Sequence, residues 1–421
     1  MQSEKVNVEE LGIKEYPKEW NTLKIKEIGK VILGTTPSTK DEDNWNGIVP
    51  FITPGDITGY KIRNTVRTIS EQGLDEKRKL PKNSITVSCI GNIGRVGITQ
   101  LDLAMSNQQI NSIVPHEKVA DNYFVLFLIK YFGDEFENYA SKTTVPILNK
   151  TNFSNIKLEV PPLPEQQKIA SILSTVQDAI EQTEAVIQAS HELKKSMMKH
   201  LFTYGPVPVD QTDQVELEET DVGQVPLNWE IQKLDEISDI TSGGTPSRKK
   251  KEYWENGDIP WVKTGEVDYG IIDDTEEKIT KEGLNNSSAK LFPNGTVLIA
   301  MYGQGVTRGR VAKLGLDATS NQACAAFLNL KGITNDYLFY ALQYEYERLR
   351  SYAHGANQKN LSATLLKQFR IAIPDQKNQT SIVNSLSSID QKMGQEIDKK
   401  LSLVKLFDSL LENLMTAKVR V

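Results

Sequence analysis

The sequence contains one ordered set of motifs twice, and this repeat limits the folds that the chain can adopt. Both copies open with Pro-x-x-Trp, at residues 17–20 and 226–229. A Gly-Thr-Thr-Pro-Ser segment follows at 34–38, and Gly-Gly-Thr-Pro-Ser stands in its place at 243–247. At 421 residues the chain is also too long for one ordinary core. We therefore predict a tandem duplication in which both copies form a domain of the same fold.

The remaining motifs keep their order in both copies and predict a mixed fold. They are a block of Trp, Gly, Pro and an aromatic residue, then a Gly-acid pair, and then Ser-Asn-Gln (Trp45, Gly47, Pro50, Phe51, Gly55-Asp56 and 106–108; Trp254, Gly257, Pro260, Trp261, Gly265-Glu266 and 320–322). Runs rich in β-branched residues at 84–88 and 296–300 predict strands. Short helices are expected near 123–139 and 337–352. Each copy is therefore predicted to be an α+β domain.

Each copy ends in a proline-containing segment that leads into a long helical pattern. The first reads Val-Pro-Pro-Leu-Pro-Glu-Gln-Gln-Lys at 160–168, and the second has one proline, Pro374, in Ile-Pro-Asp-Gln-Lys-Asn-Gln at 373–379. Proline cannot donate to a strand ladder and fixes φ near the value of a first helical turn. A strand can therefore end and a helix begin at each segment. We expect four parts: a first domain at 1–163, a helix at 164–205, an acidic connector with a second domain at 206–373, and a second helix at 374–421.

The apolar residues of the two helices form narrow stripes. On helices of ~35–40 residues such stripes favour a coiled-coil seam over packing into a globular core. Two matching helices are best explained by antiparallel packing on each other, although each could instead support only its own domain. The predicted seam residues are Ile169, Leu173, Val176, Ile180 and Ile187 in the first helix and Leu386, Ile389, Met393, Ile397, Leu401, Val404 and Leu411 in the second.

The net charge of −6 is concentrated in one segment. Residues 206–228 contain six acids and no Lys or Arg, so the rest of the chain nets to zero (−6 minus −6). No run approaches the ~18 apolar residues of a membrane span, and the first residues lack the pattern of a secretion signal. We therefore expect a cytoplasmic protein without membrane contact. The distant Cys89 and Cys324 are expected to be buried free thiols.

Taken together, the ordered motifs, present twice over the whole length, resemble the specificity subunit of type I restriction-modification systems. The resemblance implies two target-recognition domains, each reading one part of an asymmetric, split site in double-stranded DNA. It also implies two helices that set the gap and dock the methyltransferase (modification) subunits, usually two, and a restriction subunit. Such a subunit performs no chemistry and holds no cofactor or metal. S-adenosylmethionine, ATP and magnesium are used by its partners.

Candidate DNA contacts follow from the residue types that bind phosphates and bases. The set comes from the loops after the repeated glycines, from the basic clusters and from the glycine loops near 91–97 and 303–310: Thr36, Ser38, Lys40, Lys61, Arg63, Arg95, Thr245, Ser247, Arg248, Lys249, Lys263, Arg308 and Arg310. Residues shared by two domains that read different bases cannot all be base readers. Specificity is therefore expected in the unshared segments 58–82 and 268–290, and the two half-sites should differ.

Two other classes of protein stay open at this stage. An enzyme is disfavoured because neither the Asn/Asp-Pro-Pro-aromatic motif nor the glycine-rich cofactor turn of a methyltransferase is present. Asp273, Glu276 and Lys278 carry the residue types of a metal nuclease but leave no room for its hairpin, and no metal or Ser-His-Asp site is indicated. The alternative is a duplicated scaffold that binds protein or sugar instead of DNA. The Ser-Asn-Gln motifs are read as turns that cap strand ends.

Overall fold

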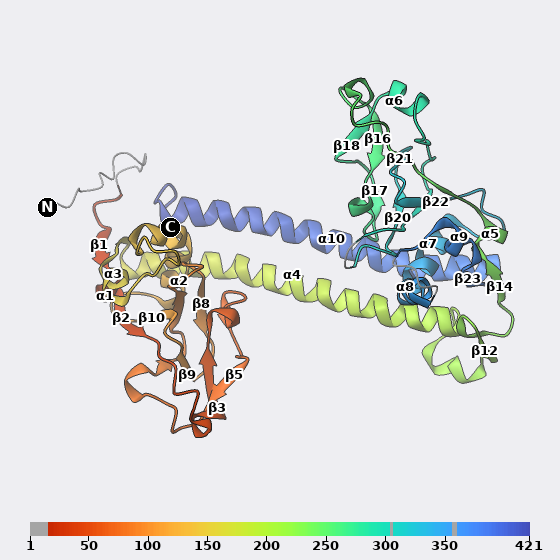
Figure 1. The fold of residues 1–421 in the computed structure, drawn as a ribbon. Coiled ribbons are helices and arrows are strands. Elements are labelled where there is room, and N and C mark those ends of the chain that lie inside the picture. Colours follow the sequence, from red (N-terminus) through yellow and green to blue (C-terminus); the bar gives the residue numbers. More distant parts are fainter. Residues whose placement is uncertain (1–15, 304–305, 356–359) are drawn as a thin grey trace. The chain divides into compact units, whose positions relative to one another are not determined.

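The chain folds into two compact units, and both long helices are divided between them (Figure 1). The computed structural model describes residues 16–303, 306–355 and 360–421. The first unit is Met1–Ala185 with Ile397–Val421, and the second is Val186–Glu396. Helix α4 (Leu163–Tyr204) begins in the first unit, whereas α10 (Gln376–Met415) begins in the second. This division crosses the four parts expected from the sequence, because each unit combines a recognition domain with a portion of both helices.

The described strands of the first unit form three sheets. Its five-stranded sheet has the order β2-β10-β7-β8-β4, comprising Gly29–Leu33, Ile110–Pro115, Ile85–Ser88, Val96–Thr99 and Lys61–Ile62. A four-stranded sheet has the order β5-β3-β9-β6, comprising Arg67–Ile69, Trp45–Ile52, Leu103–Ser106 and Leu80–Pro81. Strand β1 (Asn21–Lys24) pairs antiparallel with β11 (Lys157–Val160), just before α4. The helices α1 (Ile25–Ile28), α2 (Asn122–Phe132) and α3 (Lys150–Asn155) complete the domain.

The second unit repeats this arrangement. Its five-stranded sheet has the order β15-β22-β19-β20-β17, comprising Asp239–Ser242, Cys324–Leu328, Val297–Ala300, Val311–Leu314 and Ile271–Ile272. A three-stranded sheet has the order β18-β16-β21, comprising Glu277–Ile279, Ile259–Val262 and Thr319–Ser320. Strand β14 (Glu230–Lys233) pairs with β23 (Arg370–Ile373) before α10. The predicted duplication is therefore confirmed at the level of strand order.

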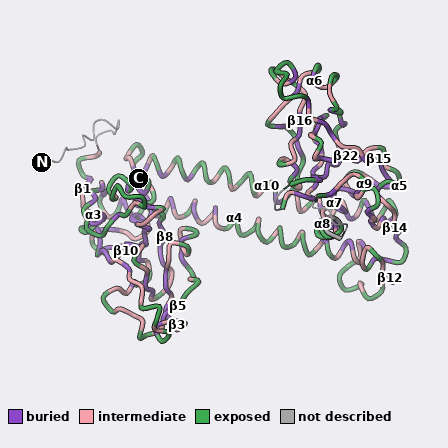
Figure 2. The backbone as a smooth tube through the Cα atoms, viewed as in Figure 1, coloured by how far each residue is buried: buried purple, intermediate pink, exposed green. Residues whose placement is uncertain are grey.

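The described short helices of the second unit are α5 (Leu234–Ile237), α6 (Lys281–Asn285), α7 (Asn335–Tyr344), α8 (Tyr346–Gly355) and α9 (Ala363–Gln368). Three helices of the second domain, α5, α7 and α9, correspond to α1, α2 and α3, whereas α8 follows α7 where the first domain has a 3-10 helix at Gly133–Tyr139, and α6 has no α-helical counterpart among the described residues. Within each unit the buried residues gather between sheets and helices (Figure 2). The long helices contribute to both cores, since Ile169 and Phe407 lie in the first and Phe202 and Leu386 in the second.

The acidic connector expected from the sequence is an ordered segment of the second unit. After α4 the chain forms a short 3-10 helix at Val209–Gln214 and then a hairpin of β12 (Leu217–Thr220) and β13 (Gly223–Pro226). Asp221 pairs with Arg370 of β23, at 3.1 Å. The hairpin therefore packs on the second domain instead of merely joining two folded parts.

The two long helices start by different means at equivalent places. At the first start the carbonyl oxygen of Pro162 accepts the backbone N–H groups of Glu165 and Gln166. At the second start Asp375 takes the place of Pro162, and its carboxylate accepts the N–H of Asn378, at 2.8 Å. An aspartate at this position satisfies a donor that has no partner inside the helix. This cap explains how the second copy begins its helix with a single proline.

Within each unit the helices run antiparallel. In the first unit Glu165, near the start of α4, binds Arg420, and Glu184 binds Lys400, at 2.6 Å in both pairs. In the second unit Lys194 binds Asp390, at 2.7 Å. As the residue numbers on α4 rise from 165 to 184 to 194, the residue numbers of their ion-pair partners fall from 420 to 400 to 390. The antiparallel pair expected from the matching stripes is thus confirmed.

On α4 none of the predicted seam residues is exposed. Its seam positions advance alternately by four and three residues, as in the seven-residue repeat of a coiled coil. Of the predicted residues, three are buried and two are half-buried (Ile169, Leu173 and Ile180; Val176 and Ile187). In the middle of the helix the same series passes through Thr183 and Lys194. The seam is therefore partly polar at its centre.

For α10 the prediction is wrong at three positions. Leu386, Met393 and Leu411 are buried and Ile389 is half-buried, but Ile397, Leu401 and Val404 are 42%, 56% and 36% exposed. Successive steps of four residues drift by ~40° each around an α-helix, since each residue turns ~100°. Positions spaced as Met393, Ile397 and Leu401 therefore rotate out of the seam. Glu396, Lys400 and Leu403, all half-buried, continue it instead.

Candidate nucleic-acid interface

The repeated Thr-Pro-Ser loops are bound to the repeated Ser-Asn-Gln motifs. Thr36 donates a hydrogen bond to Oε1 of Gln108, and Thr245 donates to Oε1 of Gln322. The preceding glycines allow the close approach, because a Cβ on Gly34 would lie 1.9 Å from the carbonyl oxygen of Asn107. A Cβ on Gly243 would lie 2.2 Å from that of Ser320. The shared motifs therefore form a framework in both domains.

The Ser-Asn-Gln motifs also make the turns predicted for them. Asn107 Oδ1 accepts the N–H of Gln109, and Asn321 Oδ1 accepts that of Ala323, at 3.1 and 3.0 Å. Ser38 and Ser247 are exposed, and their carbonyl oxygens accept the indole N–H groups of Trp45 and Trp254. Each loop is thus fixed to a tryptophan at equivalent positions. This tryptophan lies in or just before the sheet that contains β3 or β16.

Two predicted DNA contacts of the first domain bind acidic residues of α4. Lys61 of β4 pairs with Asp178, and Arg63 pairs with Glu181, at 2.9 Å. The Lys61 side chain is only 15% exposed. Tyr60 packs beside them on Phe407 of α10, with ring centroids 5.8 Å apart. In this arrangement Lys61 and Arg63 fasten the domain to the helices.

The basic residues of the second domain are paired with acids of the same domain. Arg248 donates to both carboxylate oxygens of Glu277, at 2.6 and 2.9 Å, and Lys263 pairs with Glu276. The hydrogen bonds between Arg248 and Glu277 lower the pKa of the carboxyl and raise the pKa of the guanidinium. The positive charge predicted to meet DNA is therefore balanced locally at Arg248 and Lys263.

The arginines of the glycine loops lie in three different settings. Arg95 is exposed and donates to the carbonyl oxygen of Ile57, at 2.8 Å. Arg310 pairs with Asp268, at 2.6 Å, and Arg308 is only 7% exposed. Burial removes Arg308 from direct phosphate contact in this arrangement. Part of that loop, at 304–305, lies outside the described residues.

Other predicted residues are placed openly on the surface. Lys40 and Lys249 are exposed at equivalent positions, two residues beyond Ser38 and Ser247. The site list from the sequence did not include Arg67, which is exposed on β5 and lies over the ring of Trp45, at 3.8 Å from the centroid. The sequence did offer one signal: Arg67 lies in segment 58–82, which is rich in basic residues and is not shared with the second copy. The aromatic contact was not readable from the sequence, because Trp45 and Arg67 belong to different strands.

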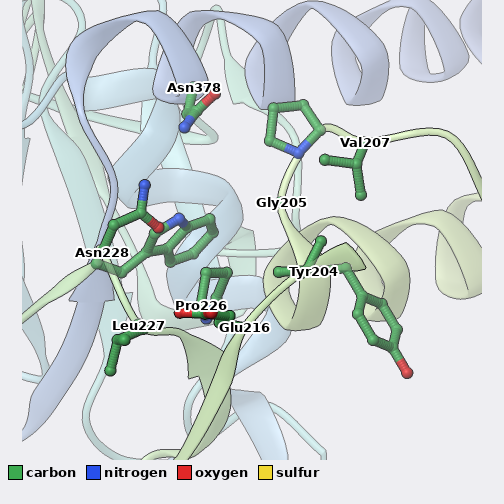
Figure 3. Close-up of a pocket in the computed structure, with 11 residues that line it drawn as sticks. Tyr204, Gly205, Val207, Glu216, Pro226, Leu227, Asn228 and Asn378 are labelled. Carbon is green, nitrogen blue, oxygen red and sulfur yellow. The ribbon is translucent and has the colours of Figure 1, made fainter. Parts of the chain in front are cut away.

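An open hollow of about 560 Å³ lies in the second unit where the connector leaves α4 (Figure 3). Its lining is largely apolar and has no Lys or Arg: Tyr204, Gly205, Pro206, Val207, Val215, Glu216, Pro226, Leu227, Asn228, Trp229 and Asn378. Without basic side chains and with Glu216 on its wall, it does not suit a polyanion. The DNA candidates lie elsewhere in the domain.

The described residues contain no group of three or more His, Cys, Asp and Glu side chains that could hold a metal ion. Cys89 and Cys324 are both buried free thiols, as predicted. Burial raises the pKa of Cys89 to about 11 and that of Cys324 to about 12. Neither thiol is therefore activated as a nucleophile. Among the described helices, none combines the length and the hydropathy that crossing a membrane requires.

Comparisons with known proteins agree with this architecture. The sequence model of the family described as "Type I restriction modification DNA specificity domain" matches residues 17–189 and 226–403. The MjaIX specificity subunit of a type I restriction enzyme from Methanocaldococcus jannaschii is 26% identical, covering 98% of this chain and 96% of the relative. The MjaVIII specificity subunit of the same organism is 25% identical, covering 99% and 96%.

A solved structure shares the fold. The S subunit of a type I restriction-modification system from M. genitalium superposes with a TM-score of 0.64 at 18% identity, covering 97% of both chains. Each of the two family matches covers one of the two domains that share the order of the five-stranded sheet. The chain therefore belongs to the family of type I restriction-modification specificity subunits and contains two copies of the family's DNA specificity domain.

Proposed function

We propose that each target-recognition domain reads one half of an asymmetric, split site in duplex DNA. The recognition parts are residues 1–163 and 206–373, and the helical parts at 164–205 and 374–421 set the gap between the half-sites. One observation carries this proposal: the two domains keep one framework but differ in the side chains that they present on it. Lys61 and Arg67 of the first domain correspond to Ile271 and Glu277 of the second.

The shared framework and the differing surface have a direct functional meaning. Residues that are equal in both domains can hold the loops, and residues that differ can distinguish bases. The bonds of Thr36 with Gln108 and of Thr245 with Gln322 belong to the first class. Two domains with different surface residues favour two different half-sites.

The exposed apolar residues of the helices support the docking of partner subunits. In the first unit Ile397, Leu401 and Val404 are exposed on α10 at a spacing that places them on one face. In the second unit Leu193 of α4 is 53% exposed. We propose that the modification subunits, two per chain, cover such residues and that a restriction subunit joins this complex. The specificity subunit itself is then non-catalytic, and S-adenosylmethionine, ATP and magnesium act in its partners.

Binding to a random library of DNA duplexes tests this function. The full-length chain is purified with its modification subunits, and bound duplexes are selected and sequenced at two salt concentrations. We expect two different conserved blocks at one fixed gap, and an affinity that falls as salt rises because phosphate contacts release counterions. A library without any conserved block, or binding to duplex DNA that does not respond to salt, contradicts the proposal and favours a scaffold that binds protein or sugar.

A further inference from the structure

We propose that Arg67 reads a guanine in the half-site of the first target-recognition domain. This inference rests on the proposed function and adds to it one residue and one base. Arg67 begins β5, where it lies opposite Phe51 of β3. In Figure 1 the sheet that contains these two strands lies at the end of the first unit away from α4.

The Arg67 guanidinium is held in place by an aromatic ring instead of by an acid. Its Cζ atom lies 3.8 Å from the ring centroid of Trp45. That ring is itself fixed, because its N–H donates to the carbonyl oxygen of Ser38, at 3.1 Å, and it packs perpendicular to the ring of Phe51, with centroids 5.3 Å apart. Among the described residues, Arg67 forms no ion pair. Stacking therefore limits its motion and leaves its N–H donors available.

The second domain has the same tryptophan with a different arrangement of charges. Arg248, from the loop after Ser247, lies over Trp254 at 3.6 Å. Glu277 stands at the strand position of Arg67, opposite Trp261, and accepts two hydrogen bonds from Arg248. The cation on the ring is thus retained, but its paired donors are occupied. The first domain alone offers a stacked arginine whose donors can meet a base at this position.

A free arginine fork matches guanine among the four bases. The O6 and N7 atoms of guanine accept two parallel hydrogen bonds at the edge exposed in the major groove, and arginine is the residue that most often makes them. The stack on Trp45 lowers the conformational entropy that such a bidentate contact costs. Arg67 therefore has both the donors and the restraint that base reading requires.

The residue before Arg67 favours a base over a phosphate. Val66, the residue just before Arg67, is 92% exposed. Exposed apolar side chains add nothing to a phosphate site but can contact the methyl group of thymine in the major groove. In the second domain the corresponding residue is Glu276, which is acidic. The exposed apolar residue next to the arginine is therefore particular to the first domain, as expected for a specificity determinant.

The test uses the full-length chain with its modification subunits and the same random duplex library. The variants are Arg67→Ala, Arg67→Lys and Arg67→Gln. For Arg67→Ala we expect the preference for guanine to disappear at one position of one half-site, and the affinity for the wild-type site to fall about 5- to 150-fold. Arg67→Lys should keep part of the preference, whereas Arg67→Gln should shift it toward adenine, whose N6 and N7 suit an amide.

Controls separate the possible failures. Lys130→Ala removes an exposed positive charge from α2 and should leave all base preferences and the affinity unchanged. Thermal unfolding of each variant checks that the fold is kept. If the wild type selects a split site but Arg67→Ala keeps every base preference, or weakens binding equally to all sequences, Arg67 is not a base reader. If the wild type selects no conserved block, the proposed function fails first and this inference with it.

Discussion

Gln166 on α4 and Gln379 on α10 make the same three hydrogen bonds at equivalent points of the two units. The side-chain amide of Gln166 donates to the carbonyl oxygens of Val119 and Pro161, and its Oε1 accepts the N–H of Asp121. Gln379 donates to Gly332 and Pro374 and accepts from Thr334. Both side chains are 99% buried, since each residue is 1% exposed. Each glutamine therefore joins a recognition domain to the helix that follows it.

Replacing Gln379 by Leu should destabilise the second unit by about 2–4 kcal/mol, because the carbonyl oxygens of Gly332 and Pro374 and the N–H of Thr334 lose their side-chain partner. Hydrogen exchange of the full-length chain should show reduced protection around 332–334 and at the start of α10, with the first unit unchanged. Thr380→Ala, at an exposed neighbouring position, should have little effect. Equal protection in the wild type and Gln379→Leu would show that the amide does not hold this joint.

Lys194 and Asp390 should be a stabilising contact of the helix pair in the second unit. The Lys194 side chain is 13% exposed, and Asp390 also accepts a hydrogen bond from Tyr340 of α7, at 2.8 Å. Lys194→Met leaves the carboxylate without its cation in a partly buried place, so we expect a loss of about 1–3 kcal/mol in the free energy of unfolding. Denaturant unfolding measures this change.

The Lys400 and Glu184 pair of the first unit is the matched control. Its side chains are 32% and 64% exposed, so Lys400→Met should cost at most ~1 kcal/mol. The double variant Lys194→Met with Asp390→Leu should recover part of the stability that Lys194→Met alone loses, since no unpaired charge then remains. The idea is refuted if both single lysine variants unfold at the same denaturant concentration as the wild type.

Glu345 should make the stability of the second unit depend on pH. It is 8% exposed, and burial raises the pKa of its carboxyl above the ordinary value of 4.5, although the hydrogen bond from Arg348 acts in the opposite direction. The folded state therefore binds its proton more tightly than the unfolded state. Between the ordinary and the raised pKa this group binds more protons when folded, so its contribution to stability falls as pH rises.

Glu345→Gln removes this titration and keeps an acceptor for Arg348. We expect the free energy of unfolding of the variant, relative to the wild type, to increase between pH 4.5 and pH 7, and to level off above the raised pKa. Denaturant unfolding at several pH values measures the difference. A difference that stays constant over this range would mean that Glu345 has the same proton affinity in both states.

Phe407 of α10 should stabilise the first unit, although it follows the whole second domain in the sequence. It is 3% exposed and contacts Tyr60 and Phe127, with ring centroids 5.8 and 5.7 Å away. Phe407→Ala should cost about 3–5 kcal/mol. Hydrogen exchange should show faster opening of β7 and unchanged protection of β19, whereas Leu406→Ala, at a 47% exposed neighbour, should change neither. Unchanged protection of β7 would contradict this assignment.

The repeat carried most of what could be predicted of the fold. Motifs such as Gly-Thr-Thr-Pro-Ser make their contacts inside one domain. Because both copies contain these motifs in the same order, the sequence predicts that both domains share a fold. The seam of α4 was predictable because its apolar residues keep the coiled-coil spacing. On α10 the choice of apolar residues led to Ile397 and Leu401, whereas the seam continues through Glu396 and Lys400. Residue type alone cannot reveal that a charged side chain occupies a seam position.

The candidate DNA contacts were harder to predict, because a basic residue gives no sign of its partner. Lys61 and Arg63 bind acids of α4 that are more than a hundred positions away in the sequence. Arg248 binds Glu277, and Arg67 meets Trp45 only after β3 and β5 have paired. Segment 58–82 could be identified as the source of specificity, but the free arginine within it depends on tertiary contacts.

Because α10 is shared between the two units, the first unit can complete its core only late in translation. Its core includes Phe407, Leu411, Leu414 and Met415, which the ribosome adds only after residues 186–396 have been made. Until then the apolar face of Phe127 and Leu173 is uncovered during translation and is open to chaperones or to aggregation. A nascent chain stopped after residue 396 would therefore lack part of its first unit while holding every residue of its second.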